Sequence, residues 1–232
     1  KMLDVKNLNL HYGNSQILYN ISMHAKLGEV TCVMGTNGVG KTSLLRAISG
    51  THPRSGGELA FDGQTLGPVG AHRMAQLGVG YVPQGRDIFP LLTVRENLQT
   101  GFSCLPRSEH FIPDEIYELF PVLKEMAHRR GGDRAGGQQQ QLAIARALII
   151  KPKVLLLDEP TEGIQPNIIQ HIGKVIGLLR DRGDIAIVLV EQYFDFAFSL
   201  ADQIVVLRRG KVIKNAPKSE ISREDILGLV SV

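Results

Sequence analysis

The chain has 232 residues, of which 43% are hydrophobic and 21% charged, enough for one large or two small domains with a packed core. Its formal net charge of +3 is small and its Lys and Arg residues are scattered, which argues against a nucleic-acid-binding protein. No apolar run approaches the ~20 residues of a membrane-spanning helix, so we expect any membrane role to depend on a partner. The two cysteines, Cys32 and Cys104, belong to no motif, which fits a reducing cytosol.

The first quarter of the chain alternates short apolar runs with turn residues, a pattern typical of an antiparallel sheet. The expected strands are Leu3–Val5, Leu8–Tyr12, Ile17–Ile21, Gly28–Met34 and Glu58–Phe61.

A glycine-rich segment separates the strand that ends at Met34 from a helix expected over Ser43–Ile48. It matches the phosphate-binding loop pattern G-x-x-x-x-G-K-[ST] at every fixed position. Its residues are Gly35, Thr36, Asn37, Gly38, Val39, Gly40, Lys41 and Thr42, followed by Ser43 in the helix. In such a loop backbone N–H groups point at phosphate oxygens, and the helix N-terminus adds partial positive charge. Lys41 would reach the β- and γ-phosphates, and the Thr42 hydroxyl would bind Mg²⁺. A chance match is expected on the order of 1 time in 100, so the loop alone predicts nucleotide binding.

Helical patterns dominate from about Pro90 onward and predict a helical insertion before the chain returns to strands. The expected helices are Val94–Thr100, Asp114–Phe120, Val122–Arg129 and the amphipathic Gln138–Ile150.

Two continuous apolar strands, Val154–Leu157 and Ile185–Val190, flank a helix over Ile168–Asp181, which indicates a parallel sheet covered on both faces. A hairpin of Ile204–Leu207 and Lys211–Ile213 and a helix over Ser222–Leu229 complete the chain. The predicted class is α/β, a mixed-sheet core with an antiparallel β subdomain and a helical subdomain.

Carboxylates follow the strand Val154–Leu157 directly. The C-terminal ends of parallel strands face the ligand crevice, so Asp158 is placed to hold Mg²⁺ through water. Glu159 is placed to orient or deprotonate an attacking water. The alternative is an ordinary surface Asp-Glu pair, which the upstream phosphate loop disfavours.

Two further segments are weaker signals. Gln84 leaves a strand just before the helical insertion, where it could contact Mg²⁺ and the water, although an ordinary loop glutamine would look the same. Gly136 and Gly137, between Ala135 and Gln138, open the amphipathic helix and expose N–H groups suited to a phosphate. In isolation that segment could be a simple turn.

Taken in order, these motifs resemble those of ATP-binding cassette (ABC) transporter ATPases, over nearly the whole chain. The ordered set is Tyr12, the phosphate loop, Gln84, the signature Gly136-Gly137-Gln138, and Asp158-Glu159. A narrower similarity links the chain to the second ATPase subunit of branched-chain amino acid and urea importers. The stretches that carry it are Gly80–Arg86, Ile88–Val94 and Leu189–Gln192. The urea-type subunit is the most similar, on the segments Asp114–Glu125, Gln138–Gln141 and Glu159–Pro166.

The resemblance implies a P-loop NTPase fold in a single ABC ATPase domain, residues 1–232. Residues 1–86 and 150–232 would form the core with its antiparallel β subdomain, and residues 87–149 the helical subdomain with the signature. Tyr12 would stack on adenine; without the resemblance it could be a buried aromatic at a strand end.

The resemblance also implies partners. Two cassettes would dimerise head to tail around two ATPs, each between one subunit's phosphate loop and the other's signature. The groove around Gln84 would receive a cytoplasmic helix of a transmembrane permease. The chain would lie at the cytoplasmic face of the cell membrane, use ATP and Mg²⁺, and work indirectly with a solute-binding protein, without nucleic acid. Its task would be uptake of urea, short amides or branched-chain amino acids.

Three positions depart from the pattern of that family. Ala135 stands where a serine usually contacts the γ-phosphate, and the charge of Arg134 beside it is a candidate replacement. Gln192 stands where a switch histidine is usual; its amide can donate to a γ-phosphate but cannot titrate. Gln165 replaces the usual aspartate after Glu159. We therefore expect a heterodimer with a related ATPase that carries the serine and the histidine, while a homodimer remains possible.

The alternatives are a non-transport cassette ATPase acting on DNA or ribosomes, and a catalytically weak regulatory subunit. The retained Glu159 argues against the regulatory subunit.

Overall fold

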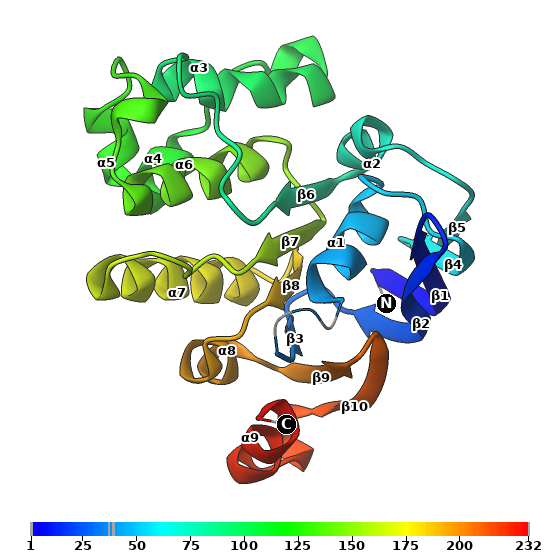
Figure 1. The fold of residues 1–232 in the computed structure, drawn as a ribbon. Coiled ribbons are helices and arrows are strands. Elements are labelled where there is room, and N and C mark those ends of the chain that lie inside the picture. The colour runs from blue at the N-terminus through cyan, green and yellow to red at the C-terminus, as the bar shows by residue number, and fades with distance from the viewer. Residues whose placement is uncertain (1, 37, 39, 232) are drawn as a thin grey trace.

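The computed structural model describes residues 2–36, 38 and 40–231, and within them the strands form two sheets (Figure 1). The antiparallel sheet has the order β2-β1-β4-β5, with bounds β1 Leu3–Tyr12, β2 Ser15–Ala25, β4 Gly56–Phe61 and β5 Gln64–Leu66. The larger sheet has the order β10-β9-β3-β8-β7-β6, with bounds β3 Val30–Met34, β6 Val79–Val82, β7 Val154–Asp158, β8 Ala186–Val190, β9 Gln203–Arg208 and β10 Lys211–Pro217. All its pairs are parallel except β9 with β10. These sheets confirm the predicted α/β class.

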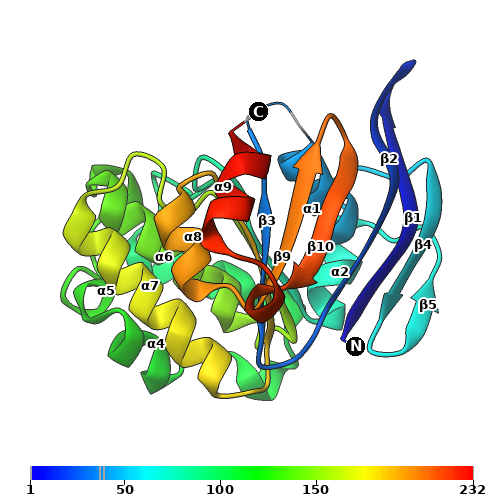
Figure 2. The ribbon, with the colours of Figure 1, turned by 90° about the horizontal axis from the view of Figure 1, so that it is seen from below.

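Helices cover both faces of the larger sheet. α1 lies between the two sheets, while α7 and α8 lie on the opposite face (Figures 1 and 2). The helices are α1 Lys41–Ser49, α2 Ala71–Leu77, α3 Val94–Gln99, α4 Asp114–Leu119, α5 Pro121–Glu125, α6 Gly136–Ile149, α7 Pro166–Asp181, α8 Phe194–Leu200 and α9 Arg223–Val230. None of the helices in the described part of the chain is both long and apolar enough to cross a bilayer.

Fully buried strands contribute side chains to two hydrophobic cores, one on each face of the larger sheet. In β7, Leu155 and Leu157 pack toward the helices α6 and α7, whereas Val154 and Leu156 pack toward α1 and the antiparallel sheet. Successive side chains of a strand point to opposite faces, so a continuous apolar run is what a doubly covered strand requires. One strand thus fixes the layers on both sides and places its end, Asp158, at the edge of the sheet.

Several predicted boundaries are wrong in detail. Leu3–Val5 and Leu8–Tyr12 are one strand, interrupted by a register shift where Asn7 has φ +52°. The helix expected over Val122–Arg129 ends at Glu125. β5 and α2 are elements that the sequence pattern did not predict.

Candidate functional site

The phosphate loop joins β3 to α1, as predicted. Gly40 caps α1 with φ +99°, a conformation that favours glycine, and a Cβ there would also come within 2.6 Å of the end of the Leu18 side chain. The first turn of α1 carries no acidic residue, which leaves its N-terminal charge for an anion. The predicted residues Asn37 and Val39 lie outside the described residues.

Lys41 lies in the site in a buried position, with 5% of its surface exposed. Its Nζ donates a hydrogen bond to the carbonyl oxygen of Gly35 and lies 3.7 Å from Oε1 of Glu159. Burial lowers the pKa of Lys41, and the charge of Glu159 opposes that effect. The ammonium is thus held between the loop that would bind phosphate and the proposed base.

Asp158 closes β7 with 1% of its surface exposed. Neither of its carboxylate oxygens has a hydrogen-bond partner among the described residues. Burial raises the pKa of Asp158 to about 6, while nearby Thr42 and Lys41 oppose the rise. The described residues contain no cluster of three or more His, Cys, Asp or Glu side chains that could hold a metal. An unpartnered buried carboxylate beside Thr42 therefore fits a cation whose other ligands come from a nucleotide and water.

Glu159 follows Asp158 in a left-handed conformation, φ +47°, and its N–H bonds the carbonyl oxygen of Val190 at 2.8 Å. Gln84 reaches it from the end of β6: Nε2 donates to Oε2 of Glu159 and to Oε2 of Glu162, both at 2.7 Å. The structure thus brings the predicted Gln84, Lys41, Asp158 and Glu159 together. The amide of Gln84 joins two carboxylates that would otherwise repel each other.

A cavity of about 310 Å³ lies over the phosphate loop and reaches Tyr12, Gly40, Lys41, Thr42 and Gln84. Tyr12 is half-buried; its hydroxyl lies 3.2 Å from the Ser43 hydroxyl, and its ring packs 4.5 Å from that of His52. Tyr12 and Ser43 are therefore at the same cavity as the loop, with one side of the tyrosine ring occupied by His52.

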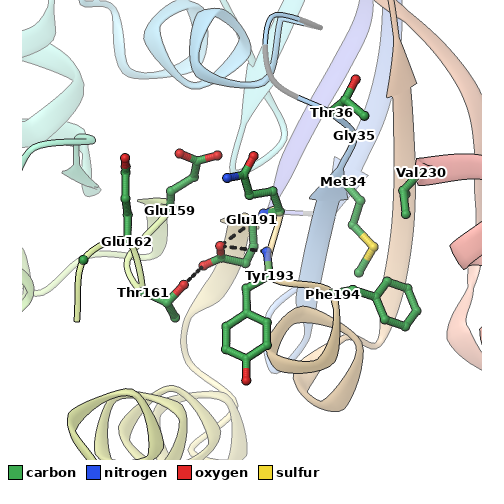
Figure 3. A pocket seen from close by; sticks show the side chains of 12 residues that line it. Met34, Gly35, Thr36, Glu159, Thr161, Glu162, Glu191, Tyr193, Phe194 and Val230 are labelled. Carbon is green, nitrogen blue, oxygen red and sulfur yellow. Dashed lines mark hydrogen bonds between the residues drawn. The ribbon is translucent and has the colours of Figure 1, made fainter. Parts of the chain in front are cut away.

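A second cavity, of about 680 Å³, shares Glu159 with the first and extends below the phosphate loop (Figure 3). Thr36, Thr161, Gln192 and Tyr193 line it, together with Glu191. Glu191 is 2% exposed, and burial raises its pKa while hydrogen bonds from Tyr193, Thr161 and Gln192 oppose the rise. The predicted Gln192 is thus on the same side of the site as Glu159.

The signature lies at the start of α6, which begins at Gly136. Ala135 is the N-cap residue, and its side chain makes no capping hydrogen bond. A Cβ on Gly137 would come within 2.5 Å of Ile168 Cδ1, so any larger residue there would force the Ile168 side chain on α7 to move. Ala135, Gly136, Gly137 and Gln138 line neither of the two cavities. The signature is therefore not part of the cavities at the chain's own phosphate loop.

The proposed compensation by Arg134 is not supported by the geometry. Its Nη1 donates to Met126 Sδ at 3.3 Å and its Nε is buried without a partner, so the guanidinium turns into the helical segment. Arg86 takes the place beside the signature instead. Its Nη2 donates to the carbonyl oxygen of Glu162 at 3.2 Å and would lie 3.1 Å from a Cβ on Gly136.

Arg86, Glu162 and Glu191 are site residues that the sequence reasoning missed. For Glu191 a signal existed, because a carboxylate directly after the buried strand β8 repeats the pattern of Glu159 directly after β7.

Comparisons with known proteins show the family of the chain. The ABC transporter family model matches residues 18–162. The high-affinity branched-chain amino acid transport ATP-binding protein BraG of Pseudomonas aeruginosa is 39% identical over 213 residues, which cover 91% of each chain. The probable branched-chain amino acid transport ATP-binding protein LivF of Archaeoglobus fulgidus is 34% identical, covering 95% of this chain and 94% of its own.

Solved structures are similar in fold. A nucleotide-free ATP-binding cassette from an ABC transporter superposes with a TM-score of 0.85 at 23% identity, over 100% of this chain and 95% of its own. The cbiO1 protein of Clostridium perfringens, part of the ABC transporter complex cbiONQ, gives a TM-score of 0.77 at 27% identity, over 94% and 89% of the two chains.

Proposed function

The chain belongs to the ABC transporter family of ATP-binding cassettes, and from that premise we propose that it is the ATP-hydrolysing subunit of a solute importer. The observation that carries the proposal is the meeting of Lys41, Glu159 and Gln84 at one cavity over the phosphate loop, with the buried carboxylate of Asp158 directly before Glu159. A regulatory subunit without hydrolysis would have no need of a carboxylate base in that position.

The chain's residues divide the work of hydrolysis. The loop N–H groups, the α1 terminus and Lys41 would bind the phosphates and balance the charge that develops as water attacks the γ-phosphate. Tyr12 would stack on the adenine. Glu159 would orient the water and take its proton, and the Gln192 amide would donate to the γ-phosphate.

A magnesium ion fits the oxygen donors of Thr42 and Asp158, with Gln84 near by, and when bound it supplies positive charge to the phosphates. Lys41 lies between Gly35 and Glu159. Binding of ATP would draw Lys41 toward the phosphates and release Glu159 for its role as base.

A second cassette would complete the site. The signature residues Ala135, Gly136, Gly137 and Gln138 lie away from the chain's own loop and would bind the γ-phosphate of a nucleotide held by the partner. We assign residues 87–149 to the helical subdomain that carries this signature, and residues 1–86 and 150–232 to the nucleotide-binding core.

The permease would dock beside the loop of Gln84. A groove of about 350 Å³ there is lined by Tyr81, Asp87, Phe89 and Arg146, between the core and the helical segment. Phe89 is 50% exposed and Leu91 is 78% exposed, so an apolar partner helix would bury surface that now contacts water. Such docking would hold the chain at the cytoplasmic face of the membrane.

The solute is either a branched-chain amino acid or urea and short amides. The names of BraG and LivF favour branched-chain amino acids, whereas the segments Asp114–Glu125 and Glu159–Pro166 favour the urea-type subunit. Uptake of leucine and of urea, measured in vesicles that carry this chain with its own permease and binding protein, separates the two.

The proposal is tested by steady-state Mg²⁺-ATP hydrolysis of the purified chain, with Glu159→Gln and Lys41→Ala as variants. We expect Glu159→Gln to lose at least ~100-fold in kcat while it still binds ATP, because only the general base is removed. Lys41→Ala should lose ATP binding itself. ATP bound without turnover by the unmodified chain would point to an obligate partner ATPase or to the regulatory role, and absence of both binding and turnover would overturn the proposal.

Ala135 and Gln192 motivate a heterodimer with a related ATPase. We expect the mixed pair to hydrolyse ATP faster than the chain alone; equal rates would contradict this.

A further inference from the structure

Glu191 is a buried carboxylate with no part in the mechanism above. It follows the last residue of β8 and is 2% exposed. Its backbone N–H bonds the carbonyl oxygen of Val33 on β3 at 3.2 Å, so its main chain is anchored in the sheet. Burial of a carboxylate is costly unless hydrogen bonds replace those of water, so the contacts it makes indicate why it is tolerated there.

Both oxygens of Glu191 are used, and they serve different loops. Oε1 accepts hydrogen bonds from the backbone N–H of Gln192 at 3.1 Å and of Tyr193 at 3.2 Å. Oε2 accepts from the Thr161 hydroxyl at 2.9 Å, across 30 residues of sequence (Figure 3). Thr161 is itself 6% exposed, so water does not compete strongly for this bond.

Thr161 lies inside the tight turn that follows Glu159. The N–H of Glu162 bonds the carbonyl oxygen of Glu159 at 3.2 Å, and the N–H of Ile164 bonds that of Thr161 at 3.2 Å. A displacement of Thr161 is therefore passed to Glu159 on one side and toward the start of α7 on the other.

We propose that Glu191 is a positioning residue that locks the Gln192 loop to the turn after Glu159, so that the two loops move as one unit. The inference rests on the proposed function, because it assigns Gln192 to the γ-phosphate and Glu159 to the water. A phosphate held by Gln192 then fixes Glu159, and loss of the phosphate after hydrolysis releases both. With no histidine at position 192, this linkage supplies the rigidity that places a neutral amide.

Thr161→Val tests the linkage without touching the Glu191 bonds to Gln192 and Tyr193. It is nearly isosteric but has no hydroxyl, whereas Thr161→Ser keeps the hydroxyl and is the matched control. We expect kcat to fall about 10-fold in Thr161→Val, as for loss of one hydrogen bond to a charged group, with KM for ATP within about twofold. Thr161→Ser should stay within about twofold of the unmodified chain in both constants.

A double-mutant cycle adds Gln192→Ala. If Glu191 acts through the Gln192 loop, Thr161→Val should change kcat by less than about twofold once Gln192 is already Ala. Full additivity of the two substitutions would show that Thr161 and Gln192 act separately, which overturns the proposal.

Hydrogen–deuterium exchange supplies a readout that does not need turnover. Mg²⁺-ATP should slow exchange in both residues 159–165 and residues 190–194 of the unmodified chain, but in Thr161→Val the protection of 159–165 should be lost. Equal protection in Thr161→Val and Thr161→Ser would overturn the linkage. Direct titration with a fluorescent ATP analogue keeps the two proposals separate. If the unmodified chain does not bind the analogue, the proposed function fails. If all variants bind it equally, the differences in exchange and kcat test the linkage alone.

Discussion

Asp158 is buried, and the nearby Thr42 hydroxyl only partly offsets the loss of water around its carboxylate, so ionisation of this side chain opposes folding. Its folded pKa of about 6 lies above the ordinary value of 3.8. Between these two values the folded state binds the proton more tightly than the unfolded state does. Stability is therefore lost as the pH rises through this window, and the full cost is present above pH 6.

We predict that Asp158→Asn stabilises the metal-free, nucleotide-free chain at pH 8, by up to about 3 kcal/mol from a shift of this size. The difference from the unmodified chain should shrink as the pH falls below 6 and vanish only below about pH 3, where Asp158 is protonated in both the folded and the unfolded chain. Urea unfolding at several pH values measures it. Asp133→Asn removes one exposed carboxylate and is the control; a difference for Asp158→Asn that is constant with pH would contradict the prediction.

Sequence reasoning could predict roles for Lys41, Thr42 and Asp158 because the prediction depends on local spacing: a fixed loop pattern and a carboxylate at the end of an apolar strand. Sequence reasoning did not predict Arg86 and Glu191, because their hydrogen-bond partners, Glu162 and Thr161, lie 76 and 30 residues away in the sequence. No local pattern states which loops will meet. The orientation of Arg134 was missed for the same reason.

At the scale of elements, the start of α6 is held by close packing against α7. A Cβ on Gly137 would approach Ile168 Cδ1 to 2.5 Å and two further side-chain carbons of Ile168 to 3.2 and 3.3 Å. The glycine therefore sets the distance between the two helices as well as exposing the backbone of the signature.

We predict that Gly137→Ala lowers the free energy of unfolding by about 1–3 kcal/mol through overpacking. Ile168→Ala should relieve the contact, so that the double variant loses less than the sum of the two single variants. Gly228→Ala is the matched control, because α9 leaves open space around that glycine and alanine favours the helix. Additive losses in Gly137→Ala and Ile168→Ala would disprove the packing argument.

Element types were predicted where the hydrophobic pattern is long or unbroken, as in β7, β8 and α7. The predictions failed where tertiary contacts decide. Residues 126–129 lie beyond the end of α5, and the backbones of Ala127 and Arg129 instead bond α3 residues. β5 has only three residues, and its pairing with β4 is what makes it a strand.

At the scale of the whole molecule, strand β2 of the antiparallel sheet closely contacts the turn between β9 and β10 of the larger sheet. The N–H of Tyr19 in β2 bonds the carbonyl oxygen of Gly210 at 2.9 Å, and a Cβ on Gly210 would come within 2.0 Å of the Ile17 carbonyl oxygen. The turn between β9 and β10 thus fixes the antiparallel sheet against the core, and with it Tyr12 against the phosphate loop.

We predict that Leu91→Asp separates ATP hydrolysis from assembly. Leu91 is 78% exposed, stands two residues after Phe89 of the groove assigned to the permease, and lines neither of the cavities at the phosphate loop. Hydrolysis by the purified chain should stay within about twofold, as for an exposed substitution, while copurification with the permease should fall. Leu178→Asp is the control, because Leu178 is exposed on α7. Equal copurification of both variants would place the permease elsewhere.

The unpartnered carboxylate of Asp158 also bears on how long the protein survives in a cell. A ligand that satisfies a buried charge binds the folded chain alone, and folded stability then rises with the logarithm of its concentration. Proteases act on the small unfolded fraction, so the abundance of a marginally stable protein follows that free energy. When ATP and magnesium are plentiful the chain would resist degradation, and during energy starvation it would be degraded sooner. The ATP concentration would thus control the abundance of this subunit.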